Sequence, residues 1–151
     1  MYLSDITRYF SPSASRIEAQ PNKLMRIAGW TTNGFWAIQK DFEPDLLKKV
    51  NNLKEVGNPE ALLKQLKKII QGYDEAKKSQ LEIHNNFIFQ GSNPLVMLKN
   101  GKLTTWINAY FLSLFGKTTL ANFNFYQAGK DKTVYVALDD TVIGIIMPVR
   151  V

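Results

Sequence analysis

The 151-residue sequence contains no cysteine and a single histidine, His84. The missing cysteines exclude disulfide bonds and every zinc site that depends on thiolate ligands. The lone imidazole has no second histidine at ligand spacing, and no serine or cysteine adjoins it. The sequence therefore supports neither a metal centre nor a catalytic triad, and we expect no metal and no cofactor.

Long apolar runs are also missing. No stretch reaches the roughly 18 to 20 uninterrupted apolar residues of a membrane-spanning helix, and the N-terminus lacks the basic-then-apolar order of a signal peptide. We therefore expect a cytoplasmic protein that does not contact membranes. Hydrophobic residues make up 45% of the chain and aromatic residues 12%, which is enough for one packed core. We predict a single domain over residues 1–151.

Acidic residues are scarce in the middle of the chain. The sequence has 19 Lys and Arg against 13 Asp and Glu, a net charge of +6. Residues 48–78 hold eight lysines and four acids, an excess of 4 positive charges, and residues 79–120 hold three lysines and one acid, an excess of 2. These two segments together account for the net charge of +6. Such a segment can bind nucleic-acid phosphates, or it can be a helix face that water solvates. Both interpretations remain open.

The chain between residues 23 and 78 predicts a hairpin followed by two helical stretches. Asn33-Gly34 lies between two apolar runs, which is typical of a type I′ hairpin turn. One helical stretch opens at residues 45–50, and Asn58-Pro59 marks the start of the second. Its apolar residues recur every three or four positions, at Leu62, Leu63, Leu66, Ile69, Ile70 and Tyr73. We expect the helix to bury this stripe.

The period then changes to that of strands. We predict two strands over residues 87–89 and 95–98, and a tight turn at Asn100-Gly101. Residues 106–115 are apolar enough to predict a buried helix that ends at Gly116. Three further strands are predicted over residues 123–126, 133–138 and 142–147. The expected fold is therefore α+β, a single domain of antiparallel hairpins with two or three helices.

Catalytic signals are weak. Gly116-Lys117-Thr118 resembles the end of a phosphate-binding loop, but that motif requires glycine where this chain has Phe111. Asp139 and Asp140 are able to bind a cation, although two acids between predicted strands are more typical of a turn. Since nothing marks a general acid and base, we predict that the protein is not an enzyme.

Three stretches point to a known family. The last residues read Ile146-Met147-Pro148-Val149-Arg150-Val151. They resemble the C-terminal signature of bacterial DNA polymerase III beta subunits, the sliding clamps, which end in an apolar residue followed by Met-Pro-Met/Ile-Arg-Leu. Residues 107–112 resemble the clamp's last helix, with one residue missing and Phe111 in the aromatic position. Thr32-Asn33-Gly34 is similar to a clamp Thr-Asp-Gly turn, although the next three residues depart from it.

The resemblance implies a DNA-clamp-like fold and a non-catalytic role in DNA replication. Clamps bind replication or repair proteins through short linear peptides, in a pocket built from the Thr-Asp-Gly turn and the C-terminal tail. Carried over to this chain, the pocket is Thr32, Gly34, Phe35, Trp36, Met147, Pro148, Val149 and Arg150. The residues alone also allow a simpler interpretation, in which Met147 and Val149 complete the core and Arg150 is solvated.

Clamps also hold double-stranded DNA on basic helices without reading its sequence. For this chain the resemblance implies DNA contacts from Lys64, Lys67, Lys68, Lys77 and Lys78. Because one domain cannot encircle a duplex, a ring requires a head-to-tail homo-oligomer. Residues 43–86 have no clear counterpart in clamps, and we interpret them as a helical insertion. A phage or mobile-element origin fits a clamp-like protein of this size.

In a second hypothesis the protein does not contact DNA. The protein is then an adaptor or an inhibitor that binds a host protein through exposed aromatic side chains, since aromatic residues dominate binding hot spots. Its anchors are Trp30, Phe35 and Trp36. The same three residues are also well suited to the core beside a hairpin, and the sequence leaves that choice open.

Overall fold

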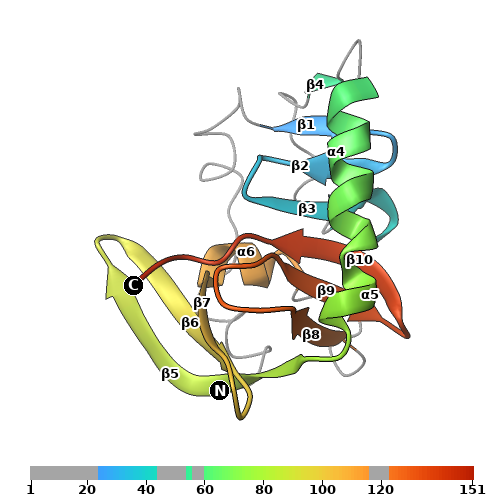
Figure 1. The fold of residues 1–151 in the computed structure, drawn as a ribbon. Coiled ribbons are helices and arrows are strands. Elements are labelled where there is room, and N and C mark those ends of the chain that lie inside the picture. The colour runs from blue at the N-terminus through green and yellow to red at the C-terminus, as the bar shows by residue number, and fades with distance from the viewer. Residues whose placement is uncertain (1–23, 44–53, 56–59, 116–122) are drawn as a thin grey trace.

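The computed structural model describes residues 24–43, 54–55, 60–115 and 123–151. In these residues ten strands form one sheet (Figure 1). The strands are β1 Met25–Ile27, β2 Trp30–Thr32, β3 Trp36–Gln39, β4 Lys54–Glu55, β5 Gln80–Gln90, β6 Asn93–Lys99, β7 Thr104–Asn108, β8 Phe123–Gln127, β9 Val134–Leu138 and β10 Thr141–Ile146. The helices are α4 Glu60–Gln71, α5 Tyr73–Ala76, α6 Ala109–Ser113 and the short 3₁₀ helix η2 Lys40–Phe42.

The strand order is β4-β1-β2-β3-β10-β9-β8-β5-β6-β7. Every neighbouring pair is antiparallel except β1 and β4, which are parallel. The α+β class of antiparallel hairpins is therefore confirmed. The sheet also curls back on itself, because the tail after β10 returns to β7, where the Val149 N–H donates to the Trp106 carbonyl at 2.8 Å.

Two separate clusters of buried side chains lie on the two faces of the sheet. One contains Leu66, Tyr73 and Ala76 from α4 and α5, packed on residues of β3, β9 and β10. In Figure 1, α4 crosses in front of β1, β2 and β3. The other cluster contains Leu112 of α6 with residues of β6 to β10. The helices α4 and α6 therefore pack against opposite faces.

Strand β10 contributes to both clusters. Val142 and Ile145 belong to the cluster with α4, and Ile143 and Ile146 to the cluster with α6. A register shift between Val142 and Gly144 interrupts its pairing with β9. At Gly144 the Phe115 ring fills the space that a side chain would need, since a Cβ there would lie 2.2 Å from one ring carbon. Phe115 itself is fully buried.

We expect Gly144→Ala to lower the free energy of unfolding by about 1–3 kcal/mol or more, because an added methyl group forces Phe115 out of its position. Urea denaturation measures this change. The matched control is Gly101→Ala, where nothing lies within 4 Å of an added Cβ, and we expect a change below about 0.5 kcal/mol there. Equal stabilities for the two variants would contradict the proposed contact.

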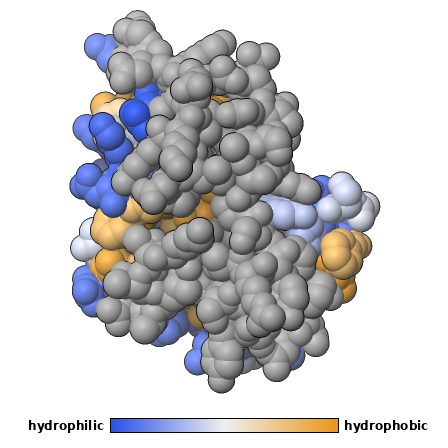
Figure 2. Space-filling view, turned by 180° about the vertical axis from the view of Figure 1, so that it is seen from behind, coloured by the Kyte–Doolittle hydropathy of each residue, from blue (hydrophilic) through white to orange (hydrophobic). Residues whose placement is uncertain are grey.

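The β5–β6 hairpin extends away from the rest of the sheet (Figure 1). In the view from behind, an apolar patch lies on this projecting part of the molecule (Figure 2). Phe89, near the end of β5, has 62% of its surface exposed. This hairpin is the longest pairing in the fold, and it confirms the strands predicted over residues 87–89 and 95–98, although β5 begins as early as Gln80.

The strands predicted near the C-terminus are confirmed as β8, β9 and β10. The helix predicted over residues 106–115 is wrong at its start. Trp106, Ile107 and Asn108 pair with β6 as part of β7, and the helix covers only Ala109–Ser113. Asn108 explains the change, because its side-chain oxygen caps the helix by accepting from the Tyr110 N–H at 2.8 Å.

The turn predicted at Asn33-Gly34 is confirmed, but the type I′ geometry is wrong. Only Gly34 has a positive φ, +93°, whereas a type I′ turn needs two such residues. The Asn33 side chain shapes the turn instead by accepting from the N–H groups of Phe35 at 2.9 Å and Trp36 at 3.2 Å. A turn that the sequence analysis missed joins β1 to β2, with Ala28 at φ 45° and Gly29 at φ 83°.

The helical prediction for residues 43–86 is confirmed in part. Residues 60–71 and 73–76 are helical, whereas residues 54–55 form β4 and residues 80–86 belong to β5. The predicted helix over residues 45–50, the Asn58-Pro59 cap and the Gly116-Lys117-Thr118 stretch lie outside the described residues. The interpretation of this region as an insertion stays a prediction.

Candidate peptide-binding groove

An apolar groove lies between α4 and the strands that it crosses. Its volume is about 170 Å³. Its walls come from α4, from the β1–β3 strands with the β2–β3 turn, and from the end of β10. The lining residues are Met25, Ile27, Thr32, Gly34, Phe35, Trp36, Ala37, Leu62, Gln65, Leu66, Ile69, Ile145 and Met147. Most of these side chains are apolar, and none is acidic or basic.

Hydrogen bonds hold the β2–β3 turn in shape. The Thr32 hydroxyl donates to the Trp36 carbonyl at 2.6 Å and accepts from the Gly34 N–H at 3.0 Å. The tail is joined to the same turn, because the Met147 N–H donates to the Phe35 carbonyl at 2.8 Å. The turn and Met147 therefore form one continuous wall of the groove.

The structure brings together five of the eight pocket residues implied by the clamp resemblance, namely Thr32, Gly34, Phe35, Trp36 and Met147. Trp36 is 4% exposed and belongs to the core, so it supports the wall and is not a surface anchor. Phe35 is 50% exposed at the rim, where its ring stacks on Phe111 with 6.4 Å between ring centroids.

The other three predicted pocket residues, Pro148, Val149 and Arg150, do not line this groove. After Met147 the tail turns toward β7, where Val149 and Arg150 line a second and more polar pocket of about 460 Å³. The Arg150 Nε lies 3.7 Å from a carboxylate oxygen of Asp131, and the Arg150 side chain is 86% exposed. The tail therefore contributes to two pockets instead of one.

The helix wall was missed by the sequence analysis. Leu62, Leu66 and Ile69 were assigned to a buried stripe, and of these three only Leu66 is buried. Leu62 and Ile69 keep part of their surface open to the groove. The width of the apolar stripe could have revealed this wall. Six apolar positions cover more of the helix surface than a narrow contact with a sheet buries, so some of them stay open.

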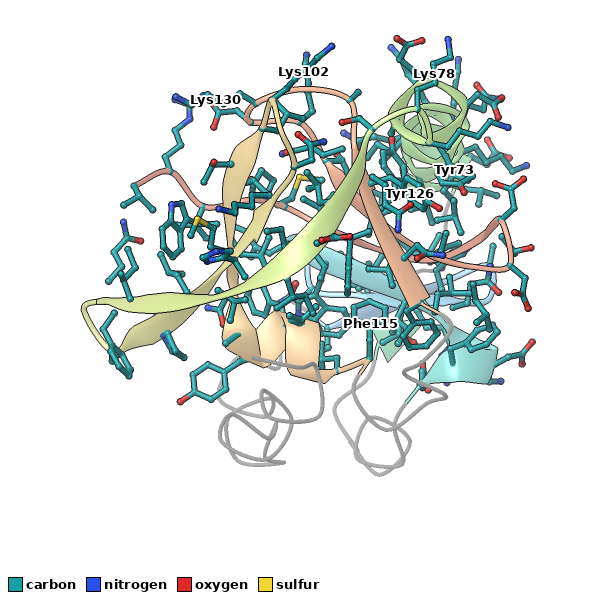
Figure 3. The ribbon with its side chains drawn as sticks, turned by 90° about the horizontal axis from the view of Figure 1, so that it is seen from below. Tyr73, Lys78, Lys102, Phe115, Tyr126 and Lys130 are labelled. Atoms are coloured by element: carbon teal, nitrogen blue, oxygen red, sulfur yellow. The ribbon has the colours of Figure 1, made fainter. Side chains whose placement is uncertain are left out.

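Two tyrosines fix the end of α4 on the sheet. The Tyr73 hydroxyl donates to a carboxylate oxygen of Asp140 at 2.7 Å, and the Tyr135 hydroxyl donates to the Ile69 carbonyl. Figure 3 labels Tyr73 and Tyr126, whose rings meet edge to face at 5.6 Å between centroids. Burial, and then the bond to Asp140, raises the pKa of Tyr73, and burial raises the pKa of Tyr135.

The raised pKa of Tyr73 predicts a fall in stability at high pH. Above about pH 10 the unfolded chain releases this proton while the folded chain keeps it, so the free energy of unfolding decreases as pH rises. We expect Tyr73→Phe to cost about 1 kcal/mol near pH 7, through the lost hydrogen bond, and to flatten the decline above about pH 10. Urea denaturation across pH 7–11 tests this, and parallel curves for the two proteins would refute it.

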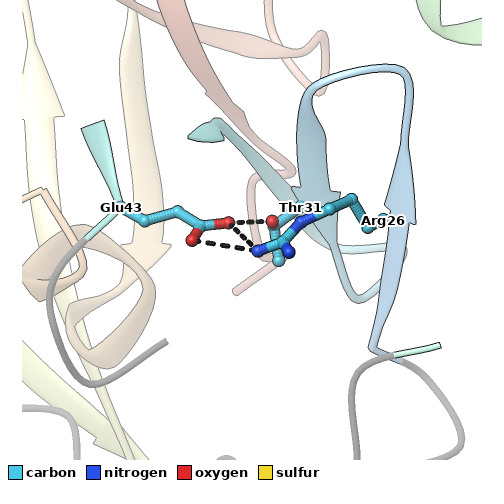
Figure 4. A network of polar contacts seen from close by, with 3 residues as sticks. All are labelled: Arg26, Thr31 and Glu43. Carbon is cyan, nitrogen blue, oxygen red and sulfur yellow. Dashed lines mark hydrogen bonds and ion pairs between the residues drawn. The ribbon is translucent and has the colours of Figure 1, made fainter. Parts of the chain in front are cut away.

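A buried ion pair secures the strands beneath the groove (Figure 4). One guanidinium nitrogen of Arg26 lies 3.0 and 3.1 Å from the two carboxylate oxygens of Glu43, and the Thr31 hydroxyl also donates to this carboxylate. The Glu43 side chain is completely buried, and 21% of the Arg26 side-chain surface is exposed. The pair ties β1 and β2 to the segment that follows η2.

We expect Glu43→Leu to lower the free energy of unfolding by about 3 kcal/mol, because it leaves a largely buried guanidinium without its partner. The double variant Arg26→Met/Glu43→Leu is expected to recover most of this loss, since it removes both charges. Thermal or urea denaturation of the two variants makes the comparison. If the single and double variants are equally unstable, the pair does not have this role.

The five lysines predicted to contact DNA are all exposed. Lys77 lies 3.8 Å from Asp74 and Lys78 lies 3.7 Å from Glu75. In the described part of the chain no ion pair involves the other three, Lys64, Lys67 and Lys68. Lys78, Lys102 and Lys130 lie along the same side of the molecule in Figure 3. Their contact with DNA stays a prediction.

The two aspartates considered as cation ligands have a structural role. Asp139 and Asp140 have φ values of 48° and 65° and form the turn between β9 and β10, as expected of turn formers. The described residues contain no group of three or more His, Cys, Asp or Glu side chains able to hold a metal ion. They also contain no helix with the length and apolar character needed to cross a membrane.

No protein-family model matches the chain, and comparisons with curated proteins and with solved structures find no match. The fold class is therefore established by the structure alone. The resemblance to sliding clamps stays a prediction from three short stretches of sequence.

Proposed function

We propose that the protein is a non-catalytic binding module of DNA replication or repair that takes a short linear peptide into the groove between α4, the β2–β3 turn and Met147. One observation supports this proposal above the others. The turn at Thr32-Gly34 and the residue Met147 come from opposite ends of the chain, and both line the same groove. These are the elements that the clamp resemblance pairs in a peptide pocket.

The chemistry of the groove suits apolar peptide anchors. Met25 and Met147 lie in the wall, and thioether side chains adapt their shape to different partners. The volume of about 170 Å³ is below the roughly 300–1,000 Å³ typical of small-molecule pockets. It therefore fits a few side chains of an extended peptide better than a compact metabolite.

The replication role and the head-to-tail homo-oligomer follow from the clamp resemblance, as does double-stranded DNA as a partner. The adaptor hypothesis loses one of its three anchors, since Trp36 is buried in the core. Trp30 is partly buried against the cluster under α4, and Phe35 remains at the rim. Phe35 is thus an exposed anchor of the adaptor hypothesis and also lines the groove, and the identity of the bound protein separates the two hypotheses.

Selection from a random peptide library displayed on phage tests the proposal. We expect wild-type protein to enrich peptides with apolar anchors, and these peptides to bind the Met147→Asp variant at least about tenfold more weakly, because a carboxylate in the wall opposes apolar burial. The matched control is Lys130→Asp, which places the same carboxylate in the second pocket. Absence of enrichment, or equal binding to both variants, would refute a peptide groove.

A further inference from the structure

We infer that the peptide partner carries acidic side chains next to its apolar anchors, and that Lys64 and Lys68 of α4 bind those carboxylates along one edge of the groove. This inference rests on the proposed function, because it assumes that the groove takes a peptide. It assigns to the partner a chemistry that the apolar lining alone does not specify.

The helix geometry places Lys68 beside the groove and Lys64 next to Lys68. Gln65 is the polar residue of α4 that lines it. Lys68 follows Gln65 by three residues, and it follows Lys64 by four. Residues at these spacings are neighbours on a helix surface. Lys64 and Lys68 are both exposed. Lys68 therefore lies beside the apolar lining, and Lys64, one turn earlier, extends this basic edge toward the N-terminus of α4.

The charges at this edge are available to a partner. None of the described residues that line the groove is acidic. Glu60 lies four residues before Lys64 on α4, yet no ion pair joins these two side chains, and none involves Lys68 within the described residues. Lys77 and Lys78, by contrast, already have carboxylates within 4 Å. The groove thus combines an apolar lining with two lysines that form no ion pair with any residue the structure describes.

Lys67 distinguishes a peptide from DNA. It is exposed, like Lys64 and Lys68, but it follows Gln65 by two residues, which places it on the side of the helix opposite Gln65, since the helix has 3.6 residues per turn. A DNA backbone binds lysines without regard to the apolar groove, so it would use Lys67 as readily as Lys68. A peptide held in the groove reaches Lys64 and Lys68 but not Lys67. The apolar lining favours the peptide.

Fluorescence anisotropy with two labelled peptides tests the inference. Both carry the same Leu and Phe anchors, followed by a run of Asp in one peptide and of Asn in the other. Because each exposed ion pair changes affinity by roughly 1.5- to 5-fold, we expect wild type to bind the Asp peptide about 3- to 20-fold more tightly at low salt. This preference should decrease as salt rises.

The variants identify the lysines responsible. We expect Lys64→Gln/Lys68→Gln to lose the preference for the Asp peptide while it keeps its affinity for the Asn peptide. Lys67→Gln, the matched control on the same helix, should keep the preference. Loss of the preference in Lys67→Gln as well would show that α4 binds polyanions in general and would overturn the inference.

Failure of the inference is distinguishable from failure of the proposed function. If both peptides bind wild type equally, and Met147→Asp weakens both, the groove takes peptides and the acidic preference is wrong. If neither peptide binds, and the library selection also fails to enrich a Met147-dependent peptide, the groove does not take peptides and both proposals are wrong.

Discussion

The two-sided burial of strand β10 is the constraint on which the rest of the structure depends. This strand pairs with β3 on one side and with β9 on the other, so it joins the N-terminal strands to the C-terminal ones. Its side chains alternate between the cluster under α4 and the cluster around α6. Gly144 makes this possible, because Phe115 occupies the place of its absent side chain. A larger residue there would displace Phe115 from the cluster around α6.

The groove is a product of this arrangement. It needs α4 at a fixed distance from the β2–β3 turn, and three contacts hold those walls: Tyr73 with Asp140, Tyr135 with the Ile69 carbonyl, and Arg26 with Glu43. The side chains that make these contacts, Tyr73, Asp140, Tyr135, Arg26 and Glu43, are not among the lining residues. The polar groups thus fix the walls in place and leave the inner surface apolar. Such preorganisation lowers the entropic cost of binding, since the walls need not become ordered around the ligand.

Sequence reasoning was accurate where a local pattern determines the structure. The strands β8 to β10 and the turn at Asn33 were found from pattern and turn chemistry alone. The boundary at Asn108 was not, because an apolar run such as Trp106-Ile107 suits a buried strand as well as a helix. The helix wall of the groove was also missed, since periodicity identifies the buried face of α4 but not the surface against which it packs. The departure of Pro148 from the groove depends on the bridge from Val149 to Trp106, a contact between distant residues.

That bridge also bears on self-association. An unpaired strand edge exposes N–H and C=O groups that recruit strands from other molecules, and folded proteins commonly cover or shorten such edges. Here the tail lies against β7 at Trp106, at one end of the ten-stranded sheet. Another copy of the chain could extend the sheet at β7 only by displacing the tail at Val149. The tail therefore has two roles. At Met147 it forms part of the groove wall, and at Val149 it covers the edge from which the sheet would otherwise grow.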